Sequence, residues 1–400
     1  MIAVLLAGLA MAQEVDGFVE LRLQGYTGVD AAVPLFAVER FRPSFSAPLS
    51  DRVVLATTIE AGLGQGWSAQ SAFAALAERE KVSPVVLEAL GASEDGNTVF
   101  GIASASDYLA VDRLTIDFQW KAADLRVGRQ ALNWGSGFAV NPSDPFPELL
   151  LTEPWRPRSG INAARLDIPI GALHGVQLVA GSDDAFLHPR LAGRATVNAL
   201  ETDWSLVGAW REEIDEGIVG LDLKGTLGVG FWLEGVVHLP AGEEAWEELV
   251  TGLDYSVPVL QSLVFTAQYY RNGSGRVGGP SPSPLEPRQA FAPALSGRDY
   301  LLTAVAAGLT PELSANVLWM QNLGDGTAFV VPSTSVLASG SIDISLAAQI
   351  PVATRGPGEL KPARRDLRVE LPRTDGSLAA LDLDGIVPAT TLILWTRFNF

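Results

Sequence analysis

The chain ends on the ten residues Thr391-Leu392-Ile393-Leu394-Trp395-Thr396-Arg397-Phe398-Asn399-Phe400. Every second residue counted back from the end gives one apolar set, with aromatic residues last: Phe400, Phe398, Thr396, Leu394 and Leu392. The other set is mixed and more polar: Asn399, Arg397, Trp395, Ile393 and Thr391. A period of two places the two sets on opposite faces of a β-strand. We therefore expect a final strand whose apolar face ends on an aromatic residue.

This terminal pattern resembles the closing strand of bacterial outer-membrane β-barrels. In that group the last strand ends in Phe and is recognised by the barrel-assembly machinery. The resemblance implies that Phe398 and Phe400 form an assembly signal. An ordinary C-terminal edge strand of a soluble domain is the alternative, because the alternation signal of any one barrel strand is weak.

The first residues predict export. Residues 2–9 form a short apolar run, and Ala10-Met11-Ala12 supplies small residues where a signal peptidase would cut before Gln13. The run is too short to span a membrane as a helix and suits a signal peptide. We expect a signal peptide over 1–12 and a single barrel domain over 13–400. An apolar N-terminal strand or helix is the alternative.

The composition favours a barrel in a membrane. The chain has 400 residues, no Cys, a mean hydropathy of +0.21 and only 18% charged residues. A soluble domain carries about 25% charged residues. After the signal region no stretch of 18 apolar residues occurs, which excludes helical spans. Apolar residues dispersed at every second position instead suit a lipid-facing barrel. The net charge of −18 argues against nucleic-acid partners, which need clustered Lys and Arg.

Alternating segments recur along the whole chain. The clearest lie at 19–24, 114–121, 165–170, 219–224 and 342–350. Further candidates, together with the final strand and the segment after Asp124, bring the total to roughly fourteen to sixteen strands: 52–63, 175–182, 203–211, 229–238, 249–257, 260–271, 299–309 and 313–323. We therefore predict an all-β fold, an antiparallel transmembrane β-barrel. A soluble β-sandwich or β-helix also alternates and is the competing fold. The terminal Phe and the wide variation in loop length favour the barrel.

One face of these segments is charged or carries amides, and in a barrel this face would surround the lumen. The candidate pore-lining residues are Glu20, Arg22, Gln24, Asp117, Gln119, Lys121, Arg126, Gln130, Arg165, Asp167, Asp222 and Lys224. Acidic and basic residues occur in similar numbers, so the expected lumen has mixed charge. For Arg126, a role in anion filtering and a structural ion pair with Asp117 or Glu20 are both open.

Three segments between strands stand out. Residues 271–298 are rich in Gly and Pro and predict an irregular loop. Residues 353–389 connect the last two strands and carry six basic residues, whose charges suit lipopolysaccharide phosphates or simple solvation. Residues 68–90 are the one helix-like stretch, for which a plug, a lid and a peripheral helix all remain open.

An internal motif supports the barrel. The segment Arg126-Val127-Gly128-Arg129-Gln130-Ala131-Leu132-Asn133-Trp134-Gly135 is followed by Asn141-Pro142-Ser143-Asp144-Pro145-Phe146. It resembles porin-like and alginate-export-like outer-membrane barrels, in which a V-G-R-Q strand ends in W-G and N-P-x-D follows. The matching residues are Gly128, Arg129, Gln130, Trp134, Gly135, Asn141, Pro142 and Asp144.

The motif also carries physical expectations. Trp134 suits a membrane interface, and the two Asn/Asp-Pro turns would fold the following loop inward as a constriction. Alternation leaves Arg129 facing lipid, where a mid-bilayer charge costs about 2–4 kcal/mol. We therefore expect either a bulge near Gly128 or a position of Arg129 close to the interface.

Enzymatic signals are weak. The three histidines, His174, His188 and His238, are far apart in the sequence, and none has a close Ser or Cys partner. Asp183, Asp184 and His188 share one loop, but their spacing matches no established metal or acid–base pattern. The sequence therefore predicts no catalytic residues, no metal site and no cofactor.

The combined expectation is an outer-membrane channel of a Gram-negative bacterium that passes small polar solutes or ions. The alternatives are a surface adhesion or assembly barrel that acts through its loops and, less favoured, an outer-membrane hydrolase. The expected partners are outer-membrane lipid, lipopolysaccharide and, during biogenesis, the barrel-assembly machinery.

Overall fold

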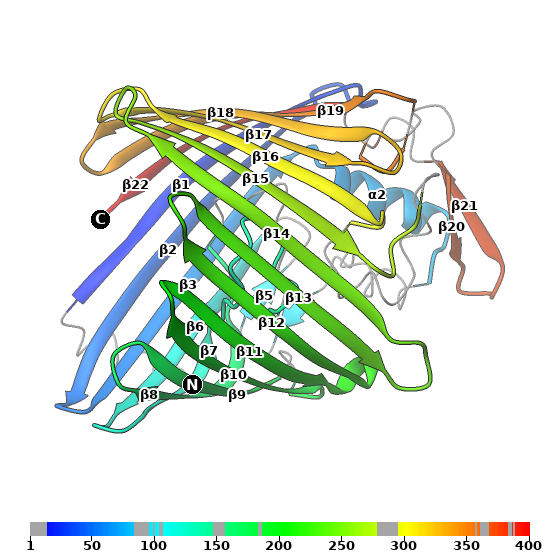
Figure 1. The fold of residues 1–400 in the computed structure, drawn as a ribbon. Coiled ribbons are helices and arrows are strands. Elements are labelled where there is room, and N and C mark those ends of the chain that lie inside the picture. Colours follow the sequence, from blue (N-terminus) through cyan, green and yellow to red (C-terminus); the bar gives the residue numbers. More distant parts are fainter. Residues whose placement is uncertain are drawn as a thin grey trace.

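Eighteen antiparallel strands form one closed barrel in the computed structural model (Figure 1). The structure describes residues 14–83, 96–98, 101–103, 107–146, 157–182, 186–277, 295–356, 358–360, 368–382, 386 and 389–400. The barrel strands are β1 (Glu14–Thr27), β2 (Leu35–Ser50), β3 (Val53–Gly66), β6 (Tyr108–Gln119), β7 (Asp124–Gln130), β8 (Ile161–Ile170), β9 (His174–Ser182), β10 (Pro189–Ala199), β11 (Thr202–Arg211), β12 (Glu216–Thr226), β13 (Gly230–Pro240), β14 (Trp246–Val257), β15 (Ser262–Asn272), β16 (Asp299–Gly308), β17 (Leu313–Asn322), β18 (Thr327–Ser339), β19 (Ile342–Ala353) and β22 (Thr390–Asn399).

Six shorter elements lie outside this ring. The hairpin β4 (Gly96–Thr98) and β5 (Gly101–Ala103) extends the edge of β6, and the hairpin β20 (Arg368–Pro372) and β21 (Leu378–Asp382) forms a separate sheet. The helix α2 spans Ala69–Arg79, and the 3-10 turn η1 spans Glu212–Ile214. No helix among the described residues is both long and apolar enough to cross a membrane.

The first and last strands close the ring. Each barrel strand pairs with its neighbours along the chain, and β22 pairs with both β19 and β1. At the seam Glu20 is in register with Arg397, and the backbone groups of Gly17 and Phe400 exchange hydrogen bonds of 3.1 and 3.0 Å. Closure leaves no open edge in the ring, which is the condition for a sheet to lie in hydrocarbon.

The two faces of the barrel have opposite polarity. On β1, Glu20 is only 1% exposed and Arg22 is buried, whereas their neighbours Val19 and Leu21 are each 44% exposed. Leu178, Leu206, Val219 and Phe398 are exposed in the same way around the outer surface. A soluble barrel would place its apolar side chains inside, so this arrangement belongs to a barrel surrounded by lipid. The predicted all-β transmembrane barrel is confirmed, and the soluble sandwich is excluded as the fold.

Eighteen barrel strands exceed the expected fourteen to sixteen. The three strands that the periodicity missed are β2, β10 and β18. Pro43 and Pro48 interrupt the alternation in β2, and Pro332 interrupts it in β18. In β10 small residues dominate, so neither face stands out as apolar. The strands form because neighbouring strands on both sides supply the ladder hydrogen bonds that local propensity does not predict.

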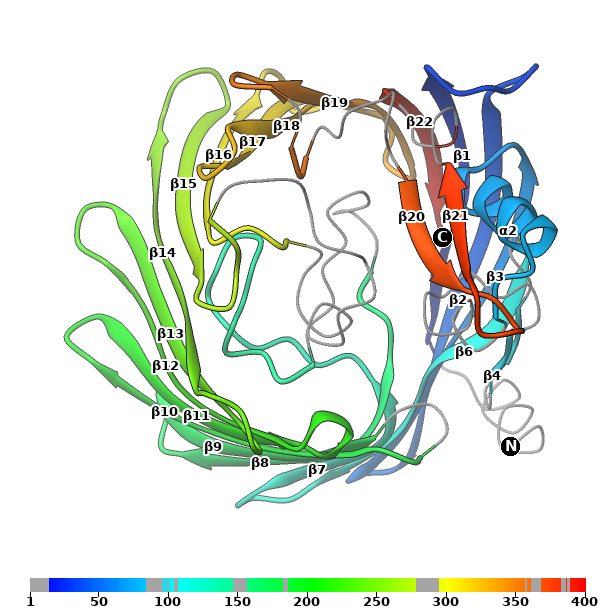
Figure 2. The same cartoon turned by 90° about the vertical axis from the view of Figure 1, so that its right-hand side faces the viewer.

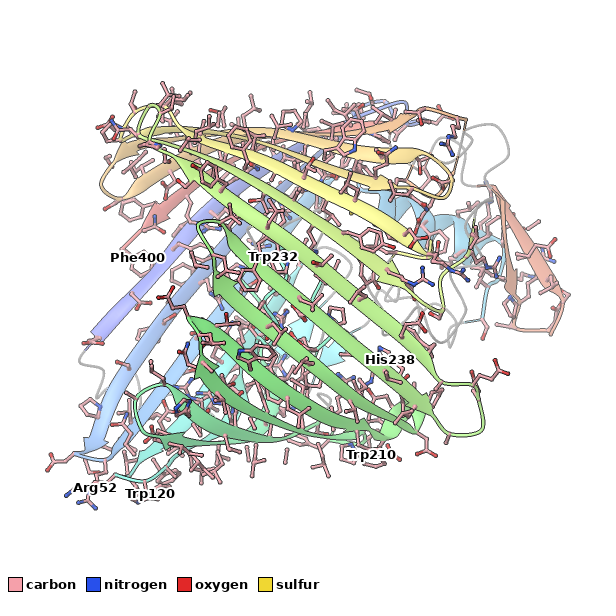
Figure 3. All side chains as sticks on the ribbon, viewed as in Figure 1. Arg52, Trp120, Trp210, Trp232, His238 and Phe400 are labelled. Atoms are coloured by element: carbon pink, nitrogen blue, oxygen red, sulfur yellow. The ribbon has the colours of Figure 1, made fainter. Side chains whose placement is uncertain are left out.

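The connections differ strongly between the two ends of the barrel. At one end short turns join the strands, including residues 51–52, 171–173 and 227–229; we call this the short-turn end. Trp120 and Phe400 lie there (Figure 3). The long connections, residues 67–107, 131–160, 273–298 and 354–389, all leave the opposite, long-loop end. Porins place their short turns in the periplasm and their longer loops outside the cell.

Two of the long loops form a small rim cap, made of α2 and the hairpin β20–β21. Ala77 and Val82 pack with Leu371, Ala379 and Leu381, all of them nearly inaccessible. The cap lies at the long-loop end, beside the wall of β1–β3 (Figures 1 and 2). The helix-like segment 68–90 is therefore a peripheral helix over 69–79, while residues 84–90 lie outside the described residues.

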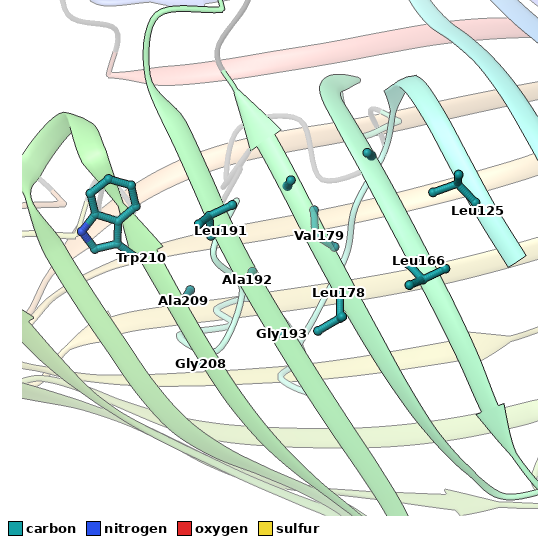
Figure 4. A pocket seen from close by; sticks show the side chains of 12 residues that line it. Leu125, Leu166, Leu178, Val179, Leu191, Ala192, Gly193, Gly208, Ala209 and Trp210 are labelled. Carbon is teal, nitrogen blue, oxygen red and sulfur yellow. The ribbon is translucent and has the colours of Figure 1, made fainter. Parts of the chain in front are cut away.

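A shallow apolar depression of about 590 Å³ crosses the outer face of β7 to β11 (Figure 4). It forms because small residues such as Ala180, Gly193 and Gly208 lie between the larger side chains of Leu191 and Trp210. The surface is lipid-facing and apolar, so hydrocarbon chains fill it without a polar cost.

The terminal aromatic residue contributes modestly to the finished barrel. Phe400 is 44% exposed and stacks on Phe41 and Phe398, with ring centroids 6.2 and 6.4 Å away. Full burial of such a side chain contributes about 1.5–3 kcal/mol, so a partly exposed one contributes less.

Deletion of Phe400 should therefore lower the amount of folded protein in the outer membrane without much lowering the heat resistance of what inserts. This expectation rests on the assembly signal that the resemblance implies, in which the terminal strand is bound by strand addition while it is still an unpaired edge. Membrane fractionation and heat-dependent gel mobility measure the two effects. Phe265→Ala, which removes an equally exposed aromatic from an internal strand, is the control. Unchanged membrane levels after the deletion would contradict the assembly role.

Candidate functional site: the lumen wall and its constriction loop

Ion pairs line the inner wall on both sides of the barrel seam. The Glu20 carboxylate accepts hydrogen bonds from Arg40 at 3.3 Å and from Arg397 at 2.6 Å. On the adjoining strands Arg42 pairs with Glu60 at 2.9 Å and with Asp112. Each strand thus presents a charge to an opposite charge on its neighbour, which compensates the desolvation of these buried groups.

A second row of ion pairs covers the inner wall from β6 to β12 near the short-turn end. Asp117 accepts two hydrogen bonds from Arg126, at 2.5 and 2.8 Å. Asp167 pairs with Arg165 at 2.8 Å, and Asp222 pairs with Arg194 at 2.9 Å. Of the two roles left open for Arg126, the geometry supplies the ion pair with Asp117.

The structure places most of the candidate pore-lining residues on this inward face. Gln119 and Lys224 lie near the short-turn end of the wall. Two candidates differ. Lys121 lies in the turn after β6 and is exposed beyond the strands, so it does not line the wall. Gln130 is only 1% exposed and donates a 3.0 Å hydrogen bond to the carbonyl of Ala163, so it is covered inside the wall.

Residues 131–160 connect β7 to β8, and we call them the constriction loop because their described parts fold into the barrel. Its described parts are 131–146 and 157–160. Leu132, Trp134 and Phe146 pack against Val179 and Val207 on the inner wall, in one cluster with Ala163 and Ala192. Figure 2 shows the segment after β7 crossing the interior of the ring. The loop turns inward already at Leu132, ahead of Asn141-Pro142, where a 3.1 Å hydrogen bond from the Asp144 N–H to the Asn141 carbonyl closes the expected turn. Residues 147–156, which follow the second expected turn, lie outside the described residues.

The position expected for Trp134 is wrong. Its side chain is 2% exposed inside the barrel, and its indole N–H donates to Gln177. The physical reason is that β7 already ends at Gln130, four residues earlier, and the chain turns inward before reaching an interface. The indole then buries its ring under the constriction loop and satisfies its N–H on the wall.

Of the two expectations for Arg129, a bulge near Gly128 or a position close to the interface, the structure shows the second. The pairing of β7 with β6 and β8 continues through both residues without a register shift, so no bulge forms. Arg129 is the last residue but one of β7 and is half-buried at the long-loop end, where the cost of a charge is small. Gly128 has φ +127°, and a Cβ there would lie 2.0 Å from the Leu114 carbonyl oxygen, so the position requires glycine.

The two ends of the constriction loop are tied to each other. Arg158 pairs with Asp144 and donates a 2.6 Å hydrogen bond to the carbonyl of Leu132. Burial raises the pKa of the Asp144 carboxyl, and this is opposed by the Arg158 guanidinium and by the N–H of Phe146. Asp144, singled out by the motif, thus holds the base of the loop.

The carboxylate of Glu234 holds the middle of the loop from across the barrel. Glu234 lies on β13 and has no solvent exposure. Its Oε1 accepts hydrogen bonds from the N–H groups of Ser136 at 2.6 Å and Gly137 at 2.5 Å. Its Oε2 accepts from the hydroxyl of Ser143 at 2.7 Å and from its N–H at 3.3 Å. We call this contact the Glu234 latch.

Glycine in the Trp134-Gly135 motif is explained by the latch. Gly135 has φ +90°, and a Cβ there would lie 2.8 Å from Oε2 of Glu234 and 2.6 Å from Cβ of Asn141. Any larger residue would push the loop away from the carboxylate. Nothing local in the sequence points to Glu234, because its partners lie more than ninety residues earlier.

Three long loops meet in one apolar cluster on the inner wall of β13 to β17. Val140 of the constriction loop, Leu295 and Leu360 pack with Trp232, Val250, Tyr270, Tyr300, Leu302 and Met320. Glu359 fixes the last loop here: it accepts a 2.6 Å hydrogen bond from Asn322 and a 3.0 Å bond from the Ser296 hydroxyl. This part of the wall is covered by loop side chains rather than open to water.

The histidines do not come together. His174 lies beside the short-turn end, and His188 contacts Glu212 at 3.1 Å among exposed residues. His238 is buried on β13, 3.2 Å from Glu216, with its ring stacked on Trp246 at 3.7 Å. Asp183 and Asp184 lie outside the described residues. Among the described residues, no three His, Asp or Glu side chains form a group that could hold a metal ion.

Comparisons with known proteins find the fold. No protein-family model and no curated protein matches the chain. Among solved structures, OccK11 (OpdR) of Pseudomonas aeruginosa matches with a TM-score of 0.57 and 10% identity, over 96% of this chain and 95% of that one. OccD3 (OpdP) of the same organism matches with a TM-score of 0.51 and 9% identity, over 98% and 92%.

A third match is Wzi, described as a carbohydrate-binding β-barrel involved in group 1 capsule assembly in Escherichia coli. Its TM-score is 0.54 at 8% identity, over all of this chain and 87% of that one. OccK11 and OccD3 are outer-membrane porins. Likeness at these identities concerns the fold alone, and the expected resemblance is confirmed at that level. The chain therefore has the fold of a porin-like bacterial outer-membrane β-barrel.

Proposed function

We propose that the protein is an outer-membrane channel that passes small polar solutes or ions through a lumen of mixed charge. The observation that supports this most strongly is the polarity of the wall. The inward face carries ion pairs on β1–β3, β22 and β6–β12, while the outward face of the same strands is apolar. A barrel of this strand number has room for water.

The pairing of these charges argues for weak ion selectivity. Glu20, Asp117, Asp167 and Asp222 each pair with an arginine, so neither sign dominates this part of the inner wall. Selective pores use rings of one charge sign, which attract one class of ion. The proposed channel therefore distinguishes solutes mainly by size, at the constriction loop.

A liposome-swelling assay tests the solute part of the proposal. Vesicles that contain the purified protein should swell in isotonic solutions of small neutral solutes, at rates that fall as the solutes grow larger. Vesicles without protein are the control. Vesicles with protein that swell no faster than this control would contradict passage of solutes through the lumen.

The rim cap supports a second candidate function, surface recognition by the loops. The cap has its own apolar core and is joined by 2.8 and 3.1 Å backbone hydrogen bonds between residues 81–83 and 372–374. Removal of the hairpin 368–382 should leave swelling unchanged if the protein is a channel. A surface phenotype with normal swelling would favour the adhesion or assembly role.

Lipopolysaccharide remains a proposed partner, and the basic residues of loop 353–389 are the groups that would bind its phosphates. Arg373 is engaged by Glu80 at 3.2 Å, whereas Arg355 is exposed at the long-loop end. A guanidinium in that position can pair with phosphate. We propose no enzymatic role; in the described part of the chain His174, His188 and His238 lie apart from one another.

A further inference from the structure

Two adjoining recesses indent the lumen wall on the short-turn side of the constriction loop. The larger has a volume of about 390 Å³, and its polar lining residues are Asp124, Asp167, Gln177, Arg194 and Thr196, beside Ile168, Pro169, Gly175 and Val176. The smaller, about 120 Å³, shares Asp124 and Asp167 with it and adds Asp117, Arg126 and Arg165. The volume of the larger recess lies within the range of ligand pockets, about 300–1,000 Å³, and the smaller recess extends it.

The constriction loop forms one boundary of these recesses. The indole N–H of Trp134 donates to Oε1 of Gln177, and Nε2 of Gln177 donates to Asp167 at 2.5 Å. This chain of hydrogen bonds fixes the amide and carboxylate that line the larger recess. Asp124 begins β7 directly after a short turn, so the recesses lie between the loop and the short-turn mouth.

The side chains around the recesses combine hydrogen-bond donors and acceptors. Three carboxylates, Asp117, Asp124 and Asp167, face three guanidinium groups, Arg126, Arg165 and Arg194. Arg126 pairs with Asp117 at 2.5 Å and Arg165 with Asp167 at 2.8 Å, whereas Arg194 pairs at 2.9 Å with Asp222, which lines neither recess. A free anion would compete with these carboxylates, and a cation would find only Asp124 outside the pairs.

A hydroxyl group suits the paired carboxylates and guanidinium groups of the recesses better than an ion does. It can donate to a carboxylate oxygen and accept from a guanidinium N–H at the same time, without breaking the pair. Several hydroxyls on one solute can repeat this along the wall.

We propose that these recesses are a binding site for a neutral polyhydroxylated solute, the chemistry of a small sugar, on the periplasmic side of the constriction loop. The inference rests on the proposed channel function and names a class of solute for it. The site retains a solute that has passed the loop before its release at the short-turn mouth.

Single-channel recording with sucrose as the probe tests the site. Sucrose should cause brief, resolvable current blockades in the wild-type protein. Asp124→Asn and Asp167→Asn should each shorten the blockades roughly tenfold, the change expected when one hydrogen bond to a charged group is lost. Asp203→Asn is the matched control: it removes an exposed carboxylate on β11, near the same mouth, that lines neither recess.

The outcomes separate the site from the channel. Open-channel conductance at the wild-type value shows that a variant is folded, and Thr196→Ala provides a further lining variant should Asp167→Asn fail this criterion. Normal ion conductance without sucrose blockades would overturn the site while leaving the channel in place. If Asp203→Asn shortened the sucrose blockades as much as Asp124→Asn does, the binding site would also be overturned, because the effect would then come from the charge of the mouth alone. A protein that conducts no ions would overturn both.

Discussion

Replacement of Glu234 by alanine is expected to release the constriction loop and to give a larger, fluctuating conductance. The carboxylate accepts four hydrogen bonds from Ser136, Gly137 and Ser143, whereas Gln268 accepts only the neighbouring N–H of Phe138, at 2.5 Å. Hydrogen bonds to charged groups contribute about 1.5–3 kcal/mol each, so their combined loss far exceeds thermal energy. Planar-bilayer recording measures the conductance and its variance.

Two variants sharpen this test. Glu234→Gln keeps one oxygen acceptor and should show an intermediate effect. Glu248→Gln changes another buried carboxyl on the adjacent strand, which makes no contact with the described part of the loop, and should conduct like the wild type. A steady, wild-type conductance in Glu234→Ala would mean that the apolar contacts of Leu132, Trp134 and Phe146 hold the loop without the latch.

Replacement of Glu20 by alanine is expected to give the largest loss of stability. The change removes the carboxylate that joins the buried Arg40 to the half-buried Arg397, and it leaves Arg40 with the carboxylate of Glu60, at 3.4 Å. Removing one partner of a buried ion pair costs about 3–5 kcal/mol. The temperature at which the barrel unfolds in detergent, read from its shift in gel mobility, should fall markedly.

Glu14→Ala is the control for the seam, since Glu14 lies on the same strand but is exposed and makes only a 3.3 Å hydrogen bond to Ser46. It should unfold near the wild-type temperature. A double variant that also replaces Arg397 should lose less than the sum of the two single changes, because the residues share one interaction. Additive losses would mean that Glu20 stabilises the barrel through contacts other than its ion pair with Arg397.

The fold could be predicted from the sequence because a lipid-facing strand needs an apolar residue at every second position. The period-two alternation at 114–121 and 219–224 required only the local chain, and the outward positions of Ile116 and Val219 follow from it. The strands that were missed show the limit of local patterns. In β2 and β18 proline interrupts the alternation, and only pairing with neighbouring strands restores it.

The site was accessible only in part. Charged residues on one strand face, such as Asp117 and Arg126, could be assigned to the wall from parity alone. The latch could not be predicted, because Glu234 and Ser136 are brought together by closure of the ring rather than by sequence spacing. The sequence predicts Trp134 at a membrane interface, but it lies inside the barrel. This could not be predicted because the end of β7 at Gln130 depends on the loop that follows it.

The most direct test of the central claim is the ion conductance of the refolded wild-type protein in a planar bilayer. An open lumen of mixed charge predicts discrete, stable conductance steps, with little preference between potassium and chloride in a salt gradient. The absence of steps from protein whose heat-dependent gel shift shows it to be folded would contradict the channel. Such a barrel would be closed by its loops, and its function would then lie on its surface.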